Sequence, residues 1–308
     1  MLTMFGLPRP FRGHIGGIQT NAIQSWTLLR PSCEVILFGD EDGTAEMATK
    51  FGIQHVPDVE RNEYGTPLVN SLFSAAQKLG NHELLCYVNA DIILMSDFLP
   101  AVQSIAERRC LLVGRRWDLD VNEPINFDNP NWEAALRDSL SKTGRLHRAT
   151  GLDYFVYPRD LYGDMPPFAI GRTAWDNWIV FRTRSSGLPV IDASKSVTVV
   201  HQNHDYSHHP MGEEGVWKGI EAKRNSELLG GIYCSFNLWD ATHILTPDGL
   251  KPALSIRHLY WRLQRLPETH PHFTPVVIVI RGLRSLVYGT AGLRRKWRLP
   301  GRRKKKLP

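Results

Sequence analysis

The order of apolar and amphipathic segments limits this chain to very few folds. Short apolar runs occur at residues 2–7, 33–38, 53–56, 84–88 and 111–114, with helical patterns between them. Run 84–88 is almost continuously apolar, which is typical of a strand covered on both faces. A β-α-β-α order of this kind predicts an α/β fold with a doubly wound, mostly parallel sheet flanked by helices. In such sheets, ligands bind at the carboxyl ends of the strands.

The helical patterns are marked by apolar residues that recur every three or four positions. We expect helices at 15–29, from Thr44, from Pro67 as a first-turn residue, at 98–107, at 131–142, from Ala174 and at 213–229. Further strands are expected at 154–157 and 197–200, and the pattern weakens from Pro247.

Length and charge distribution suggest one domain with a basic extension. We expect a catalytic domain over 1–245, divided into a nucleotide-binding half, 1–121, and an acceptor-binding half, 122–245. Residues 246–308 would form a basic helical C-terminal extension. Eleven of the 37 Lys and Arg residues follow position 280, where there is no acidic residue, so the 31 acids outnumber the bases before it. An acidic body of this kind argues against a nucleic-acid partner.

The basic end of the chain predicts a possible surface for membrane contact. Residues 276–306 mix apolar residues with Lys and Arg, as do helices that lie on anionic membranes. The alternative is a helix packed on the domain with a solvated basic end. Because the first residues lack the apolar stretch of a signal peptide, we expect a cytoplasmic protein that could attach to the inner membrane face.

The motif Asn89-Ala90-Asp91 is the strongest chemical signal, because it interrupts two apolar strand segments. A carboxylate at this position is costly to bury unless a cation or hydrogen-bond donors compensate it. At a strand end it could hold Mn²⁺ or Mg²⁺ under a diphosphate, whose developing charge needs such an ion. The alternative is an aspartate that caps the next turn.

Two further motifs carry candidate catalytic and ligand residues. In Trp175-Asp176-Asn177-Trp178, the tryptophans could wall a sugar site and Asp176 could act as a general base, or the segment could simply begin a helix. Four histidines then lie between positions 201 and 209. We expect one of them, His201 or His204, to complete the metal site with Asp91.

Smaller signals suggest nucleotide contacts. Gly6 and Arg9 follow the first strand, where a base and ribose could lie against the backbone. Asp40 could bind ribose or belong only to a polar turn. Arg172 could offset phosphate charge or pair with a carboxylate. Asp153, in Gly151-Leu152-Asp153, could lie beside the acceptor and is a second candidate for the general base.

Together these motifs resemble the GT-A superfamily of nucleotide-diphospho-sugar transferases. Asn89-Ala90-Asp91 looks like its D-x-D-type metal motif with the first acid replaced, Gly151-Leu152-Asp153 like its acceptor loop, and Asp176 like the base of inverting members. His201 or His204 matches the histidine that follows the closing strand. The resemblance covers roughly residues 1–230. It implies a metal-dependent, inverting glycosyltransferase with a nucleotide-sugar donor and a glycan or lipid-linked glycan as acceptor.

Other functions remain open at this point. A sugar-nucleotide pyrophosphorylase would share the sheet, although Gly6-Leu7-Pro8-Arg9-Pro10 is a poor version of its loop. A metal-dependent hydrolase could use His201, His204, His208 and His209. A carbohydrate-binding module could use Trp175 and Trp178.

Overall fold

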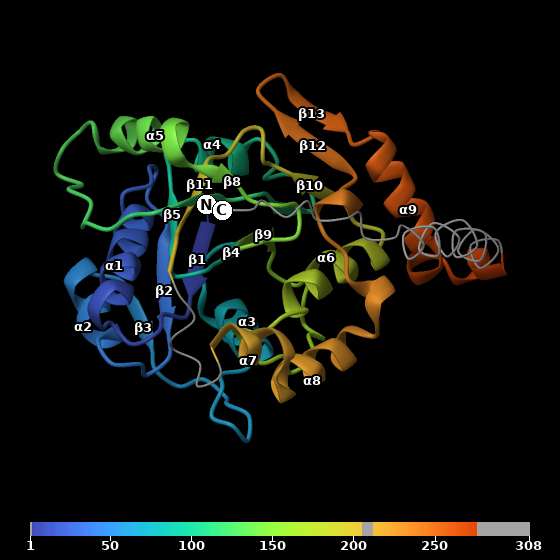
Figure 1. Cartoon of the computed structure of the whole chain (residues 1–308), viewed down its shortest axis with the longest axis horizontal. Helices are drawn as coiled ribbons and strands as arrows, with labels where there is room; N and C mark the ends of the chain where they lie inside the picture. The colour runs from blue at the N-terminus through green and yellow to red at the C-terminus, as the bar shows by residue number, and fades with distance from the viewer. Residues whose placement is uncertain (1, 205–211, 276–308) are drawn as a thin grey trace, which may run out of the picture.

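The computed structural model describes residues 2–204 and 212–275 and places two β-sheets between helices (Figure 1). The larger sheet has the strand order β13-β12-β10-β6-β9-β4-β1-β2-β3. Its strands are β1 Leu2–Gly6, β2 Glu34–Phe38, β3 Gln54–Val56, β4 Leu84–Val88, β6 Leu111–Val113, β9 Tyr154–Pro158, β10 Val190–Asp192, β12 His243–Thr246 and β13 Gly249–Pro252. The smaller sheet, in the order β5-β11-β7-β8, contains β5 Ile92–Leu94, β7 Trp117–Leu119, β8 Arg145–Leu146 and β11 Val199–Gln202.

Helices cover both faces of the larger sheet. They are α1 Gly13–Thr27, α2 Thr44–Phe51, α3 Val69–Leu79, α4 Phe98–Gln103, α5 Trp132–Thr143, α6 Trp175–Ser185, α7 Gly212–Lys218, α8 Ile220–Leu229 and α9 Ile256–Thr269, with 3₁₀ turns η1 Ile232–Cys234, η2 Leu238–Asp240 and η3 Pro271–Phe273. In Figure 1, α1 and α2 lie at one end of the molecule, and the β12–β13 hairpin and α9 lie at the other.

The larger sheet is mostly parallel, as the sequence predicts. Strand β1 runs parallel to β2 and β4, and β10 runs parallel to β6 and β12. Strand β9 lies antiparallel between β4 and β6. The expected α/β class with a doubly wound, largely parallel sheet is therefore confirmed.

Alternate residues of the central strands enter two separate cores. On β4, Leu85 and Tyr87 pack with α3, α6 and α8, whereas Cys86 and Val88 pack with α1 and α4. Since successive side chains of a strand point to opposite faces, a strand covered on both sides must be apolar at every position. This explains the continuous apolar run at 84–88 and fixes the position of the polar residues that follow it.

Several predicted elements differ from those observed. Pro67 precedes the helix instead of opening it, because its carbonyl accepts a hydrogen bond from Ile170 and the helix begins only at Val69. The helix expected over 98–107 ends at Gln103, where the Ser104 hydroxyl bonds the Ala101 carbonyl and tighter turns follow.

The single helix expected over 213–229 is two helices, α7 and α8. Gly219 adopts an extended conformation between them and serves as the N-cap of α8. A Cβ at Gly219 would lie 2.4 Å from the Gly215 carbonyl oxygen, so the close turn requires glycine.

Regular structure continues beyond Pro247. Strands β12 and β13 form an antiparallel hairpin on the edge of the larger sheet, so the boundary expected between residues 245 and 246 falls inside β12. Gly249 has a φ of 105° in the hairpin turn. The sequence Pro247-Asp248-Gly249 is a turn signal that could have predicted the hairpin.

The proposed membrane segment, 276–306, lies wholly outside the described residues. Within the part of the chain that is described, no helix combines the length and apolar character needed to cross a bilayer.

Candidate functional site

The three main motifs of the sequence, those of Asp91, Asp176 and His201, line one cavity of about 620 Å³. Its walls come from the segment after β1, the end of β4, the loop before β9, the start of α6 and the end of β11. The volume falls in the range of about 300–1,000 Å³ that is usual for small-molecule sites. The cavity thus lies at the carboxyl edge of the parallel strands, where the topology predicts a ligand.

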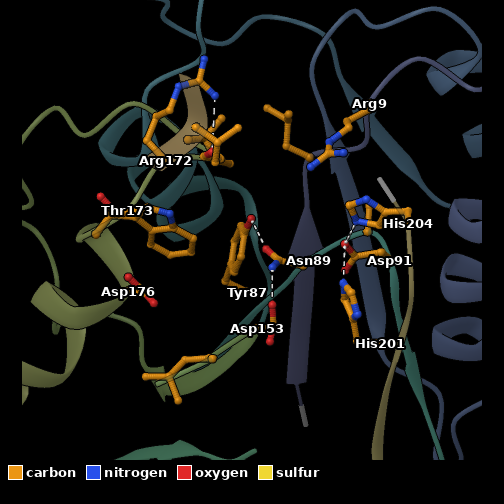
Figure 2. A pocket seen from close by; sticks show the side chains of 18 of the residues that line it. Arg9, Tyr87, Asn89, Asp91, Asp153, Arg172, Thr173, Asp176, His201 and His204 are labelled. Carbon is orange, nitrogen blue, oxygen red and sulfur yellow. Dashed lines mark hydrogen bonds and ion pairs between the residues drawn. The ribbon is translucent and has the colours of Figure 1, made fainter. Parts of the chain in front are cut away.

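Asp91, His201 and His204 form a compact group on one wall of the cavity (Figure 2). Asp91 Oδ2 lies 3.1 Å from His204 Nε2 and 3.6 Å from His201 Nε2. Strand β11 pairs with β5, directly after Asp91, and so brings residues more than 100 positions apart together. Both histidines therefore face the one carboxylate, although the sequence could not choose between them.

The donor set of this group suits a divalent cation. One oxygen of Asp91, Oδ1, is buried without a hydrogen-bond partner, and such an atom is costly unless something compensates it. One carboxylate oxygen and two imidazole nitrogens lie within 4.8 Å of one another. Two ligand atoms bound at right angles to each other, each roughly 2.1 Å from a cation, would lie about 3 Å apart. The separations between the Asp91 oxygen and the two imidazole nitrogens are of this order. Within residues 2–204 and 212–275, it is the only such group.

The two histidines also set the charge state of Asp91. Burial would raise the pKa of this carboxyl, but the facing His201 and the hydrogen bond from His204 outweigh burial and hold the pKa well below its usual value. Desolvation lowers the pKa of His201 and so favours the neutral imidazole. An ionised carboxylate beside neutral imidazoles is the form that binds metals.

A second layer of charged residues supports this wall. Asp118 on β7 is buried, and its Oδ1 lies 3.6 Å from His201 Nδ1 and 3.0 Å from Arg116 Nε. Its other oxygen lies 2.7 Å from His147 Nδ1. Carboxylates behind metal-ligating histidines orient the ring and fix its tautomer. Asp118 has the position for that role.

Asn89 and Asp153 are joined by hydrogen bonds, and this pair is called the Asn89–Asp153 strut. The Tyr87 hydroxyl donates to Asn89 Oδ1 at 2.9 Å, and the Asn89 amide donates to Asp153 Oδ1 at 2.8 Å. The same Asp153 oxygen accepts from Arg116 at 2.6 Å. Asp153 is 4% exposed. A buried carboxylate neutralised by an arginine is poorly placed to remove a proton from an acceptor.

Asp176 lies on the opposite wall from Asp91 (Figure 2). It is partly exposed in the first turn of α6. Burial raises its pKa to about 7, partly offset by backbone hydrogen bonds. The preceding Ala174 has a φ of 87°, the only positive φ of a non-glycine residue among those described. Such strain is tolerated where the surroundings fix the backbone, and here it sets the start of α6.

Arg9 and Arg172 line the cavity from two sides, and Figure 2 shows them on the same rim. The Gln19 side chain holds the Arg9 backbone by accepting from its N–H at 2.6 Å and donating to its carbonyl at 2.8 Å. Glu221 accepts from Arg172 Nη2 at 2.6 Å and from Nε at 3.0 Å. Arg172 is therefore paired with a carboxylate, as one of its two sequence interpretations states.

Comparisons with known proteins bear on the fold. No protein-family model matches the chain, and neither does any curated protein. Among solved structures, S. aureus TarS is similar with a TM-score of 0.50 and 14% identity, over 88% of this chain and 43% of TarS. The chain has the GT-A fold.

Two further solved structures are similar at lower TM-scores. Glucosyl-3-phosphoglycerate synthase from Mycobacterium tuberculosis gives 0.46 at 14% identity, over 75% of this chain and 80% of that one. The mannosyltransferase PcManGT from Pyrobaculum calidifontis gives 0.41 at 15% identity, over 65% and 56%. The chain thus spans less than two thirds of PcManGT and less than half of TarS.

Two residues expected to bind nucleotide lie outside the cavity of this GT-A fold. Gly6 ends β1, and a Cβ there would lie 2.6 Å from the Val88 carbonyl oxygen, so glycine is needed for close strand packing. Asp40 is exposed and pairs with Arg61. Neither residue is among the described residues that line the cavity, and nucleotide binding by either one stays a prediction.

The two tryptophans of the α6 motif do not form a paired sugar platform. Trp178 is 6% exposed and packs against Tyr162 and Phe168 in the core, whereas Trp175 reaches the cavity only with part of its surface. The carbohydrate-binding module built on both rings is therefore a wrong interpretation of the motif. His208 and His209 lie outside the described residues.

Arg116 and Asp118 are site residues that the sequence reasoning missed. Both belong to Arg115-Arg116-Trp117-Asp118, which follows strand β6 and its terminal glycine. Consecutive arginines at the carboxyl end of an apolar strand were a usable signal, because in a GT-A-like sheet that edge faces the ligand.

Proposed function

We propose that the protein is a metal-dependent glycosyltransferase of the hexosyltransferase type. It would move a sugar from a nucleotide-diphosphate donor to an acceptor hydroxyl with inversion. One observation carries this proposal: a single cavity has a metal-ligand group, Asp91 with His201 and His204, on one wall and a carboxyl group with a pKa near 7, Asp176, on the other.

The wall with Asp91 would hold the donor diphosphate. A divalent cation held by Asp91, His201 and His204 would neutralise the charge that builds on the leaving nucleotide. Arg9 lines the same cavity and adds positive charge on this side. Arg116 would support the Asn89–Asp153 strut through its ion pair with Asp153, and Asp118, which pairs with Arg116, lies behind the ligand His201.

The wall with Asp176 would hold the acceptor. A general base works best when its pKa lies near the operating pH, and burial brings the pKa of Asp176 to about 7. Asp176 would take the proton of the acceptor hydroxyl as that oxygen attacks the anomeric carbon from the side opposite the diphosphate. Direct displacement of this kind inverts the anomeric centre. Asp153, the second candidate base, would instead position Asn89 and Arg116.

The ligand set favours Mn²⁺ over Mg²⁺. Mg²⁺ prefers an octahedral shell of oxygens and keeps several waters, whereas imidazole nitrogens suit transition metals. Two of the three donors here are imidazoles, and Asn89 already uses its amide in the strut.

The acceptor would be a glycan or a lipid-linked glycan, as in polysaccharide biosynthesis, with the enzyme at the cytoplasmic face of a membrane. Residues 150–153 and 170–177, which include Asp176, line the cavity, and we propose that they bind the acceptor. The basic segment 276–306 supports a membrane location through its composition.

A metal-dependent hydrolase is the main rival, because one carboxylate and two histidines can also activate a metal-bound water. A hydrolase would release free sugar or phosphate without an acceptor. A pyrophosphorylase would instead release pyrophosphate from a nucleoside triphosphate and a sugar phosphate. Product analysis separates the three activities.

Thermal-shift screening tests the proposal most directly. The purified protein would be scanned with UDP-, GDP-, CMP- and dTDP-sugars, each with and without Mn²⁺. A ligand that binds only the folded state raises the melting temperature by mass action. We expect one nucleotide class to raise it only when Mn²⁺ is present. No shift with any sugar nucleotide would contradict the proposal.

A further inference from the structure

Helix α9 is inverted relative to an ordinary surface helix. Its buried residues include His258, Gln264 and Arg265, which are 4%, 2% and 5% exposed. Its solvent side carries Ile256 and Leu259, which are 86% and 50% exposed. A surface helix normally buries its apolar face and exposes its polar face, so this arrangement requires an explanation.

The buried polar face is held by specific partners. Arg265 pairs with the buried Asp240 and lies over the rings of Phe236 and Trp261. Arg262 donates to the Ala241 carbonyl at 2.7 Å. These contacts, with Pro267 and part of Trp261, attach α9 to η2 and the residues after it, so the exposed apolar residues are not needed for this packing.

Five exposed large apolar residues, here called the α9 stripe, lie on this helix or just before it: Leu254, Ile256, Leu259, Tyr260 and Leu263. From Ile256, the spacings of three, four and seven residues place the helical members on one side of α9. Single exposed apolar residues are ordinary, but a group of five large ones marks a surface for a partner or a membrane.

The charges around the α9 stripe favour an anionic surface. Residues 249–267 contain no Asp or Glu and four Lys or Arg residues, of which Arg262 and Arg265 belong to the inward face and Lys251 and Arg257 are exposed. Arg257 is exposed beside the stripe, with its guanidinium 5.2 Å from the centre of the Trp239 ring. Lys251, on β13, pairs with Asp248 in the hairpin turn. The 11 basic residues after position 280 follow α9 in the chain.

We propose that the α9 stripe docks on a membrane surface that contains anionic lipid. The apolar side chains would enter the boundary between headgroups and acyl chains, and the cations would face the lipid phosphates. Figure 1 shows α9 at the outer end of the molecule, beyond α6. The proposal is independent of the glycosyltransferase activity, because no stripe residue lines the cavity.

Vesicle flotation of the full chain tests the proposal. The stripe variant carries Ile256→Glu, Leu259→Glu and Leu263→Glu, which add charge on an exposed helix face and should not prevent folding. The matched control carries Tyr64→Glu, Leu79→Glu and Ile220→Glu, which are exposed apolar positions on other elements. Both variants change the net charge equally. Vesicles of phosphatidylcholine with 30% phosphatidylglycerol would be compared with pure phosphatidylcholine.

We expect wild type and control to float with the anionic vesicles, and the stripe variant to lose at least tenfold in partition coefficient. Equal binding of stripe variant and control would overturn the proposal, and so would a wild type that does not bind. A concentration-dependent dimer that the stripe variant abolishes would assign the stripe to a second copy instead. A melting temperature lowered only in the stripe variant would indicate that the chain's own later residues cover it.

Discussion

Two aspartates face the same cavity from opposite walls, and their surroundings give them opposite properties. Asp91 lies between two imidazoles, which hold its pKa well below the usual value despite burial. At Asp176, burial raises the pKa to about 7, and the negative charge of Asp153 adds to the rise. The side chains are chemically identical, so the difference comes entirely from what each wall places next to the carboxyl group.

This contrast indicates how one site can hold charge on one side and move a proton on the other. A carboxylate that stays ionised can bind a cation at any physiological pH. A carboxyl group with a pKa near 7 can accept a proton and release it again. Titratable groups whose environments push their pKa values apart are typical of acid–base chemistry. Substitutions on either wall test whether the two carboxyl groups have these different roles.

The largest expected effect comes from Asp91→Asn. The variant keeps the shape of the side chain but removes the charge that compensates a cation. We expect Mn²⁺ binding in isothermal titration to be lost and transferase turnover to fall about 10³-fold or more, since electrostatic stabilisation of the leaving group is usually the largest catalytic contribution.

Asp40→Asn is the matched control for this change. Asp40 is exposed and outside the cavity, so its neutralisation should leave Mn²⁺ affinity and turnover within about twofold of wild type. Full turnover of Asp91→Asn, with an unchanged melting temperature, would remove the metal from the mechanism.

Asp176→Asn should have the next largest effect. Loss of a general base costs about 10²–10⁴ in kcat, while Mn²⁺ and nucleotide binding should stay unchanged. Because the base acts when deprotonated, wild-type kcat should rise with pH up to about 7 and then level, and the variant should lack this rise. A flat wild-type profile between pH 5 and 8 would contradict the assignment.

The same residue gives a stability test that does not require activity. Its folded pKa is raised from the ordinary 3.8, so folding becomes less favourable as pH increases above about 4 and this loss is complete once pH passes about 7. The difference in melting temperature between Asp176→Asn and wild type should therefore grow across that interval in favour of the variant. Thermal melts at pH 4, 6 and 8 measure it.

The sequence predicts the strands and the residues that line the site better than it predicts the charged residues behind them. Apolar runs identify the strands, and the polar residues after run 84–88 must lie at the sheet edge, so Asp91 can be placed. Asp176 follows from a motif at a helix start. Both predictions use information within a few residues.

Long-range contacts explain what the sequence does not predict. Both His201 and His204 contact Asp91 because β11 pairs with β5, a register that no local pattern encodes. Asp118 and Arg116 belong to the site through residues far along the chain, His201 and Asp153. The inverted helix α9 was missed for a related reason: periodicity shows that a helix has an apolar face but not which face the fold buries.

Asp118→Asn tests whether the charged residues behind the Asp91 wall increase its affinity for metal. Loss of this charge should loosen the orientation of His201, and such changes typically cost 10–100-fold in metal affinity. Mn²⁺ titration would measure the affinity. The control is Asp97→Asn, which removes a carboxylate paired with Arg137 away from the cavity. Equal Mn²⁺ affinity in both variants would assign Asp118 a purely structural role.

The smallest expected effect is a change of metal preference in His204→Asp. The wild-type group offers one oxygen and two nitrogens, and so should bind Mn²⁺ more tightly than Mg²⁺. An aspartate at position 204 gives two carboxylates and one imidazole, a set that suits Mg²⁺ better. We expect the ratio of Mg²⁺ to Mn²⁺ dissociation constants to fall about tenfold in calorimetric titrations. His14→Asp, at an exposed position of α1 outside the cavity, controls for the added charge. If the ratio stays constant in His204→Asp, then His204 is not a ligand, and only Asp91 and His201 would distinguish this wall from the one that carries Asp176.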